Sequence, residues 1–388
     1  MNVLRRLSTR DLIVLVLGVL ALCGGGAAIA TAAGGGSAAP PPEPLSQAVH
    51  DALAAPRPAG VTARIRFTNN LLPSGGLIGQ VGSPLMSGAS GRLWLTADGR
   101  GRVELQSNAG DAQIVWDAES ISIYDASSNT VYRAKLPSGE APTGSAPDRT
   151  SPPTPAQIDD VLARLGKYWE LSGANPTNVA GRPAYSVSAS PKDNGSLLSS
   201  VELAWDATQG APLRAGIYAK DHTAPVLELA VTDISYGAVP SSDVDVSPPA
   251  GAKVVDLGSL PRTDKASGTA QVTGLGAVQA AAGFPVVAPE SLDGKPREDV
   301  RLVGGDTALV LYGHGLGTIA LVERKADASG SAGNQMSGLP SVSLDGLTAH
   351  ELATPLGTVL AWRSGGTSYV LAGSLPPAAA ESAARAVK

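Results

Sequence analysis

The sequence has few of the residues on which enzyme sites and disulfide frameworks depend. It contains one cysteine and four histidines among 388 residues. A single cysteine excludes an intramolecular disulfide and a cysteine-rich zinc site. The histidines stand at positions 50, 222, 314 and 350, so no pair has the spacing of a local zinc motif. Gly-x-Ser-x-Gly and Ser-x-x-Lys nucleophile motifs are also absent from the sequence. We therefore predict a protein that is not an enzyme and uses no cofactor or metal.

Charges and aromatic residues are scarce as well. Charged residues make up 16% of the chain, below the ~25% of a typical soluble protein. Lys and Arg number 29 against 34 Asp and Glu, and this net charge of −5 argues against nucleic acid as a partner. Apolar residues at 43% are sufficient for packed cores. At roughly 150 residues per domain, the length allows two or three domains.

The N-terminus predicts an extracytoplasmic protein. Three arginines within the first ten residues precede an uncharged run from Leu12 to Pro42. Leu12–Cys23 has the length of a signal-peptide hydrophobic region, and the uncharged residues up to position 33 are numerous enough to cross a bilayer. Residues 1–33 are thus either a cleaved signal peptide or a transmembrane anchor. Lipidation at Cys23 is a third reading, although Leu22 occupies a position where the lipobox has a small residue.

Composition divides the remainder into two folded parts. A Gly- and Pro-rich linker occupies residues 34–44, and a polar linker occupies 256–269. We expect one domain over 45–255 and a small α+β domain over 270–375. Residues 376–388 are expected to form a short helix or a frayed tail.

Alternating apolar and polar side chains in 45–255 predict an antiparallel sheet with one dry face. The pattern is clearest over 61–68, and Asp98–Gly99 predicts a hairpin turn. Two amphipathic helices are expected, one over 45–53 and one that Thr154 caps. Two helices are few for about nine strands. Either the sheet curls on itself, or part of its inner face stays uncovered as an apolar groove that could hold a ligand.

The candidate groove-lining residues are apolar side chains at the alternating positions. Packing in an ordinary core is the alternative for each of them, because any antiparallel sheet has an apolar inner face. The candidates are Ile65, Phe67, Leu93, Leu95, Val103, Leu105, Ile114, Trp116, Leu203 and Trp205.

Other motifs are better explained by structure than by chemistry. Gly313–Gly317 lies between two predicted strands and lacks the Lys-Ser/Thr ending of a phosphate-binding loop, so it predicts a turn. Asp159 and Asp160 are expected in the first turn of a helix, where carboxylates favour the dipole. Asp243 and Asp245 lack the Gly and Glu of a calcium loop.

Several segments resemble the LolA/RseB superfamily in their order and spacing. They are Arg92–Leu105, Ile114–Arg133, Gly181–Val187 and Val201–Asp206, followed by Ile234–Gly237 and Pro248–Val254, which resemble its closing strand. The resemblance covers about residues 45–255. It implies an eleven-stranded half-barrel that helices cap and whose concave face binds acyl chains.

The resemblance also implies a function. Members of the superfamily carry lipoproteins or lipids across an envelope, or sense them and restrain an anti-sigma factor. We therefore expect a non-enzymatic binding or carrier protein for a lipid, a glycolipid or an acylated protein. The alternative is an RseB-like regulator that senses lipid and binds a membrane-bound anti-sigma factor. The Ala- and Gly-rich composition suits an actinobacterium, and a retained anchor on the cytoplasmic membrane would prevent shuttling.

Overall fold

The computed structural model describes residues 39–56, 58–71, 84, 88–108, 110–136, 152–192, 194–259, 272–326 and 339–387. The predicted signal peptide or anchor over 1–33, including Cys23, lies outside these residues. Within the described ranges, no helix is long and apolar enough to span a bilayer.

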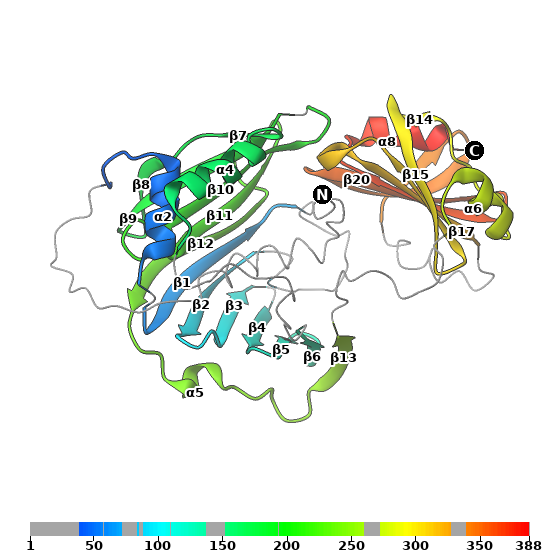
Figure 1. The fold of residues 1–388 in the computed structure, drawn as a ribbon. Coiled ribbons are helices and arrows are strands. Elements are labelled where there is room, and N and C mark those ends of the chain that lie inside the picture. The colour runs from blue at the N-terminus through cyan, green and yellow to red at the C-terminus, as the bar shows by residue number, and fades with distance from the viewer. Residues whose placement is uncertain are drawn as a thin grey trace.

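The first part of the described chain forms one large curved sheet, which we call sheet A (Figure 1). The strands follow the order β13-β6-β5-β4-β3-β2-β1-β12-β11-β10-β9-β7, and β8 also pairs with β9. The strands are β1 (Gly60–Asn69), β2 (Ala89–Thr96), β3 (Gly101–Ser107), β4 (Gly110–Trp116), β5 (Ser120–Asp125), β6 (Thr130–Lys135), β7 (Trp169–Leu171), β8 (Asn175–Val179), β9 (Arg182–Pro191), β10 (Leu198–Asp206), β11 (Pro212–Ala219), β12 (Leu227–Tyr236) and β13 (Lys253–Ser259).

Strand β1 joins two antiparallel meanders, because it pairs with β2 on one side and β12 on the other. The predicted turn at Asp98–Gly99 is confirmed, since it connects β2 to β3 with Gly99 at a φ of 86°. The resemblance implied eleven strands, whereas sheet A has thirteen. Part of the difference is that the short strands β7 and β8 both pair with β9. β13 is the one strand of sheet A that pairs in parallel, with β6.

Both predicted helices are present: α2 (Leu45–Ala54) and α4 (Pro155–Leu165). Helix α4 begins with a capping box, in which the Gln157 side chain accepts from the Thr154 backbone N–H and the Thr154 hydroxyl accepts from the Gln157 N–H. The expectation for Asp159 and Asp160 was wrong. The helix begins at Pro155 and has no acidic residue in its first turn, so these carboxylates lie farther from the helix N-terminus.

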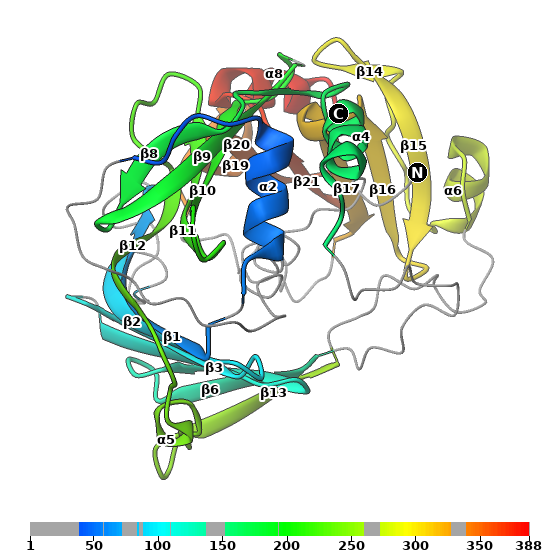
Figure 2. The same cartoon turned by 60° about the vertical axis from the view of Figure 1, so that its left-hand side comes forward.

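Helix α2 covers only one end of sheet A. Its Ala48 is buried against Tyr185 of β9 and Trp205 of β10. Figures 1 and 2 show α2 and α4 on the concave side, over the half of the sheet that β8–β11 form and away from β3–β6. The turn after β10 fixes the C-terminal end of α2, because a Cβ atom on Gly210 would overlap the Ala52 carbonyl oxygen.

A buried carboxylate fixes that turn in place. Asp206 has no exposed surface, and its Oδ1 accepts from the backbone N–H groups of Thr208 and Gln209 at 2.8 and 3.0 Å. Its Oδ2 accepts from Arg182 Nε at 2.8 Å and from the Tyr236 hydroxyl at 2.9 Å. Because every oxygen of this buried charge has partners, the group links β9, β10 and β12 instead of destabilising them.

The second part of the described chain forms an eight-stranded antiparallel sheet, sheet B, in the order β14-β15-β16-β17-β21-β20-β19-β18 (Figure 2). The predicted turn at Gly313–Gly317 is confirmed, as is the C-terminal helix. The elements are α6 (Leu275–Ala281), β14 (Ser291–Leu292), β15 (Lys295–Val303), β16 (Thr307–Tyr312), the 3₁₀ helix η2 (Gly315–Gly317), β17 (Ile319–Lys325), β18 (Ser341–Leu344), β19 (Leu347–Thr354), β20 (Gly357–Ser364), β21 (Thr367–Gly373) and α8 (Pro377–Arg385).

One acidic side chain is enclosed in the core of this second part. Glu323 has no exposed surface; its Oε2 accepts from the Val287 N–H at 2.8 Å, whereas its Oε1 has no partner among the described residues. Burial raises the pKa of Glu323 from its ordinary value near 4.5 to about 7, although the Val287 bond opposes the shift. The protonated form therefore fits this site better than the ionised form.

The two parts touch through the β9–β10 turn. The backbone N–H of Leu197 donates to the Ser374 hydroxyl at 2.7 Å, and Ser374 donates onward to the Leu356 carbonyl at 2.8 Å. A Cβ atom on Gly317 would lie 2.5 Å from the Gly195 carbonyl oxygen, so the two turns meet backbone to backbone.

Replacement of Gly210 tests how α2 is fixed. Gly210→Ala should lower the free energy of unfolding by about 3 kcal/mol, because the new Cβ meets helix α2 and the φ of 63° disfavours side chains. Gly99→Ala is the control: its φ is 86° but nothing lies within 4 Å, so we expect a loss of about 1 kcal/mol. Urea unfolding measures both losses, and equal losses would contradict the packing of the turn against α2.

Glu323 should make stability depend on pH. Since its pKa is higher in the folded state than in the unfolded chain, its contribution is complete below pH 4.5 and is lost as the pH rises through 7. We expect the stability difference between wild type and Glu323→Gln to change by on the order of 3 kcal/mol over this range. Urea unfolding at pH 4.5 and 7.5 measures the difference; a constant value would show that Glu323 ionises normally.

Candidate functional site

Apolar side chains form continuous rows across one face of sheet A. Strand register determines this, because cross-strand partners point to the same side of a sheet. One row, from β1 to β6, contains Ala63, Leu93, Val103, Ile114, Ile123 and Tyr132. The same face continues through β12, β11, β10 and β9, where the row contains Phe67, Leu229, Ala215, Leu203 and Val187. The ten candidate residues therefore share one face.

Packing divides the ten candidates into two groups. Eight belong to one apolar cluster, in which Ile65, Val103 and Leu105 are buried and the others are half-buried: Phe67, Leu93, Leu95, Ile114 and Trp116. Leu203 and Trp205 belong to a second cluster with Ala48 of α2. Helix α2 thus covers these two residues, while the larger cluster lies on the other part of the face.

From β3 to β6 the large apolar side chains of this face become more exposed, although the small Ala134 of β6 is buried. Val103 and Leu105 of β3 are 9% and 4% exposed, Ile121 and Ile123 of β5 are half-buried, and Tyr132 of β6 is 37% exposed. These last three residues were not among the sequence candidates. Their alternation was visible in the sequence, but nothing in it distinguished the covered strands from the uncovered ones. The β5–β6 end is where an added apolar molecule can still remove surface from water.

A glycine shapes this face beside its largest side chain. Gly101 of β3 pairs with Trp116 of β4, and a Cβ atom on Gly101 would overlap the indole ring. The ring therefore lies directly against the β3 backbone. Because position 101 has no side chain, the indole ring lies closer to the sheet backbone than it could beside a larger residue.

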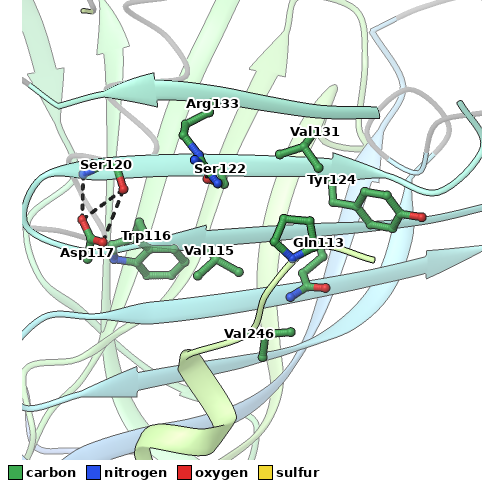
Figure 3. Close-up of a pocket in the computed structure, with 11 residues that line it drawn as sticks. Gln113, Val115, Trp116, Asp117, Ser120, Ser122, Tyr124, Val131, Arg133 and Val246 are labelled. Carbon is green, nitrogen blue, oxygen red and sulfur yellow. Dashed lines mark hydrogen bonds between the residues drawn. The ribbon is translucent and has the colours of Figure 1, made fainter. Parts of the chain in front are cut away.

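The opposite face of sheet A is polar and carries a cavity of about 230 Å³ (Figure 3). Gln113, Ser122 and Arg133 line it from the sheet, and residues 246–248 line it from the other side. Gln113 and Ser122 alternate with Ile114 and Ile123 of the apolar face, but Trp116 of that face also lines the cavity. At its edge the Glu119 and Ser120 N–H groups and the Ser120 hydroxyl outweigh the effect of burial and hold the pKa of Asp117 below its usual value.

Ion pairs attach the covering segment to this polar face. Arg100 donates through Nη1 to both oxygens of Asp245 at 2.8 Å, and Arg102 donates to the Asp243 carbonyl at 3.2 Å. Asp243 lies in the short helix α5 (Ser241–Val244). The Arg100–Asp245 ion pair and the Arg102 bond to the Asp243 backbone thus hold the segment in place. In the part of the chain that the structure describes, no three His, Cys, Asp or Glu side chains are grouped to hold a metal ion.

The comparisons with known proteins concern the fold alone. Neither a protein-family model nor a curated protein matches the chain. Among solved structures, MucB in complex with MucA(peri) is similar at 16% identity, with 89% of this chain and 96% of that chain covered and a TM-score of 0.41. The Pseudomonas aeruginosa MucA/MucB complex is similar at 17% identity, 88% and 94% coverage and a TM-score of 0.40. The LolA superfamily protein NE2245 from Nitrosomonas europaea is similar at 10% identity, 53% and 99% coverage and a TM-score of 0.21.

Replacing two isoleucines on the same face tests which strands of that face are covered. Ile65→Ala removes a side chain that is 4% exposed and should cost about 3 kcal/mol of unfolding free energy. Ile123→Ala removes a half-buried one and should cost about 1 kcal/mol. Chemical denaturation of both variants gives the comparison. A loss at Ile123 as large as that at Ile65 would mean that β5 is covered like β1.

Proposed function

We propose that this protein binds an acyl chain of a lipid or an acylated protein on the apolar face of sheet A, outside the cytoplasm. The observation that carries the proposal is the continuous apolar face, which is buried at Ile65 of β1 and at Val103 and Leu105 of β3, half-buried over β5, and exposed at Tyr132 of β6. A surface of this kind is unfavourable in water unless a ligand covers it. The site needs no catalytic group, in keeping with a binding or carrier protein.

The energy available is sufficient for useful affinity. Burial of apolar surface contributes about 0.8 kcal/mol per CH₂ group. A fully buried sixteen-carbon chain would thus contribute on the order of 10 kcal/mol before the entropic cost of association. Half-buried residues such as Ile114, Trp116 and Ile123 offer the contact surface. The affinity depends on chain length more than on the headgroup.

A sensing role is the second candidate, and one contact favours it. Strand β10 carries Leu203 and Trp205 in the cluster under α2, and the turn at its other end donates from Leu197 to Ser374 of the second part. A ligand that moved β10 would therefore act directly on sheet B. In this reading the second part would bind a membrane-bound anti-sigma factor, and the ligand would alter that binding.

A carboxylate introduced on the apolar or the polar face of β4 tests on which face the lipid binds. Ile114→Glu places a carboxylate on the apolar face, and Gln113→Glu places one on the polar face of the same strand. We expect Ile114→Glu to lower the amount of co-purified lipid at least about tenfold, because burying an unpaired charge is costly, and Gln113→Glu to leave it unchanged. Native mass spectrometry of detergent-free protein measures the bound lipid.

The outcomes separate the alternatives. Loss of lipid in Gln113→Glu alone would place the ligand in the cavity on the polar face. Equal retention in all variants would contradict binding on the apolar face. If Ile114→Glu does not fold, Tyr132→Glu replaces it, because Tyr132 is 37% exposed and its replacement costs less stability.

A further inference from the structure

The C-terminal part of helix α4 and the turn after it carry exposed apolar side chains. Val161 is 47% exposed, Leu165 39% and Tyr168, in the turn that follows the helix, 69%. The spacing of four residues places Val161 and Leu165 on one side of the helix, and Tyr168 follows in the turn after it. Ile158 lies on the same side at the start of the helix and is buried, so only the C-terminal part of this side is exposed. Nine large apolar side chains are exposed in the described ranges, and three of them are Val161, Leu165 and Tyr168.

Basic groups surround this apolar side. Arg164 is three residues beyond Val161 and so lies beside it on the helix, and it donates to the backbone carbonyl of Asp160. Lys167 is exposed in the next turn, and the Lys192 ammonium group donates to the Gly166 carbonyl at the end of the helix. The acidic residues nearby are Asp159 and Asp160 toward the helix start and Glu170 in β7. The end of the helix that carries Leu165 and Tyr168 is therefore its basic end.

We propose that this α4 patch, defined as Val161, Arg164, Leu165, Lys167 and Tyr168, docks on the surface of an anionic lipid bilayer. A tyrosine beside aliphatic side chains and lysine or arginine is the composition that favours the membrane interface. The apolar side chains enter the boundary between headgroups and acyl chains, while the basic groups contact lipid phosphates.

Chain connectivity supports the bilayer as the occupant. Helix α4 packs on α2, which is the first described helix after the uncharged run that begins at Leu12. The twelve residues from 33 to 45 span at most about 40 Å when fully extended. A chain with a retained anchor therefore keeps the α4 patch within reach of the membrane. A chain without the anchor would dock from solution.

The α4 patch is separate from the proposed acyl-chain site on the apolar face of sheet A. The α4 patch contains none of the apolar residues of sheet A, so either site can fail without the other. Docked on a bilayer, the protein would hold sheet A near the lipids that it is proposed to bind.

Local fluorescence quenching in the full chain tests the docking. In a Cys23→Ser background, one environment-sensitive dye is attached at Leu165→Cys, or at Val303→Cys in sheet B as the matched control, since Val303 is 44% exposed. Vesicles contain spin-labelled lipid in equal phosphatidylglycerol and phosphatidylethanolamine, or in phosphatidylcholine alone. We expect roughly threefold stronger quenching at 165 than at 303 in anionic vesicles, and a loss of this difference at about 0.5 M salt.

Two further variants examine the chemistry. Arg164→Gln should weaken the quenching at 165 about fivefold, because one basic group is lost. Val161→Ser with Tyr168→Ser should abolish it while lipid retention, measured by native mass spectrometry, stays unchanged. Equal quenching at 165 and 303 would overturn the proposal, as would quenching that is independent of lipid charge. Protection of the 165 dye by envelope proteins without vesicles would assign the patch to a protein partner and would also overturn it.

Discussion

The register of β1 is the constraint on which sheet A depends. This strand pairs with β2 and β12, so its register determines which side chains of both meanders point to the apolar face. A slip of one residue would turn every apolar side chain of one meander to the polar face. The β12 pairing includes one extra residue, Thr232, opposite the Arg64–Ile65 step, and its hydroxyl donates to the Arg64 carbonyl at 3.3 Å. This bulge keeps Leu229 and Ile234 of β12, which pair with Phe67 and Ala63, on the same side, and the apolar rows continue through it.

The two ends of sheet A are built differently. At the β9–β10 end, helix α2 and the bonds to Asp206 make a closed corner. At the β5–β6 end, the apolar side chains lie under no described helix. The Arg100–Asp245 ion pair and the Arg102 bond to the Asp243 carbonyl, which hold the segment after β12, lie on the polar face. A fixed frame around an uncovered apolar surface is the arrangement that a binding protein needs. The frame keeps its shape while the ligand supplies the missing cover.

Local patterns predicted much of this fold from the sequence. The alternation over 61–68, the turn at Asp98–Gly99 and the Thr154 cap each depend on neighbouring residues, and each was confirmed. Contacts between distant residues could not be predicted. The bonds to Asp206 join residues 24 and 30 positions apart, and the parallel pairing of β13 with β6 has no local signal. The cover that α2 gives to Leu203 and Trp205, while Ile121 and Ile123 stay half-exposed, depends on the same long-range packing.

The central claim is that an acyl chain occupies the apolar face of sheet A. Photocrosslinking of the full chain with a diazirine-bearing palmitate, followed by peptide mass spectrometry, tests it most directly. The account predicts crosslinks at β4–β6 residues of that face, foremost Ile121, Ile123 and Tyr132. Crosslinks confined to the polar face, at Gln113 or Val246, would contradict it, as would labelling that is no stronger than that of a control protein.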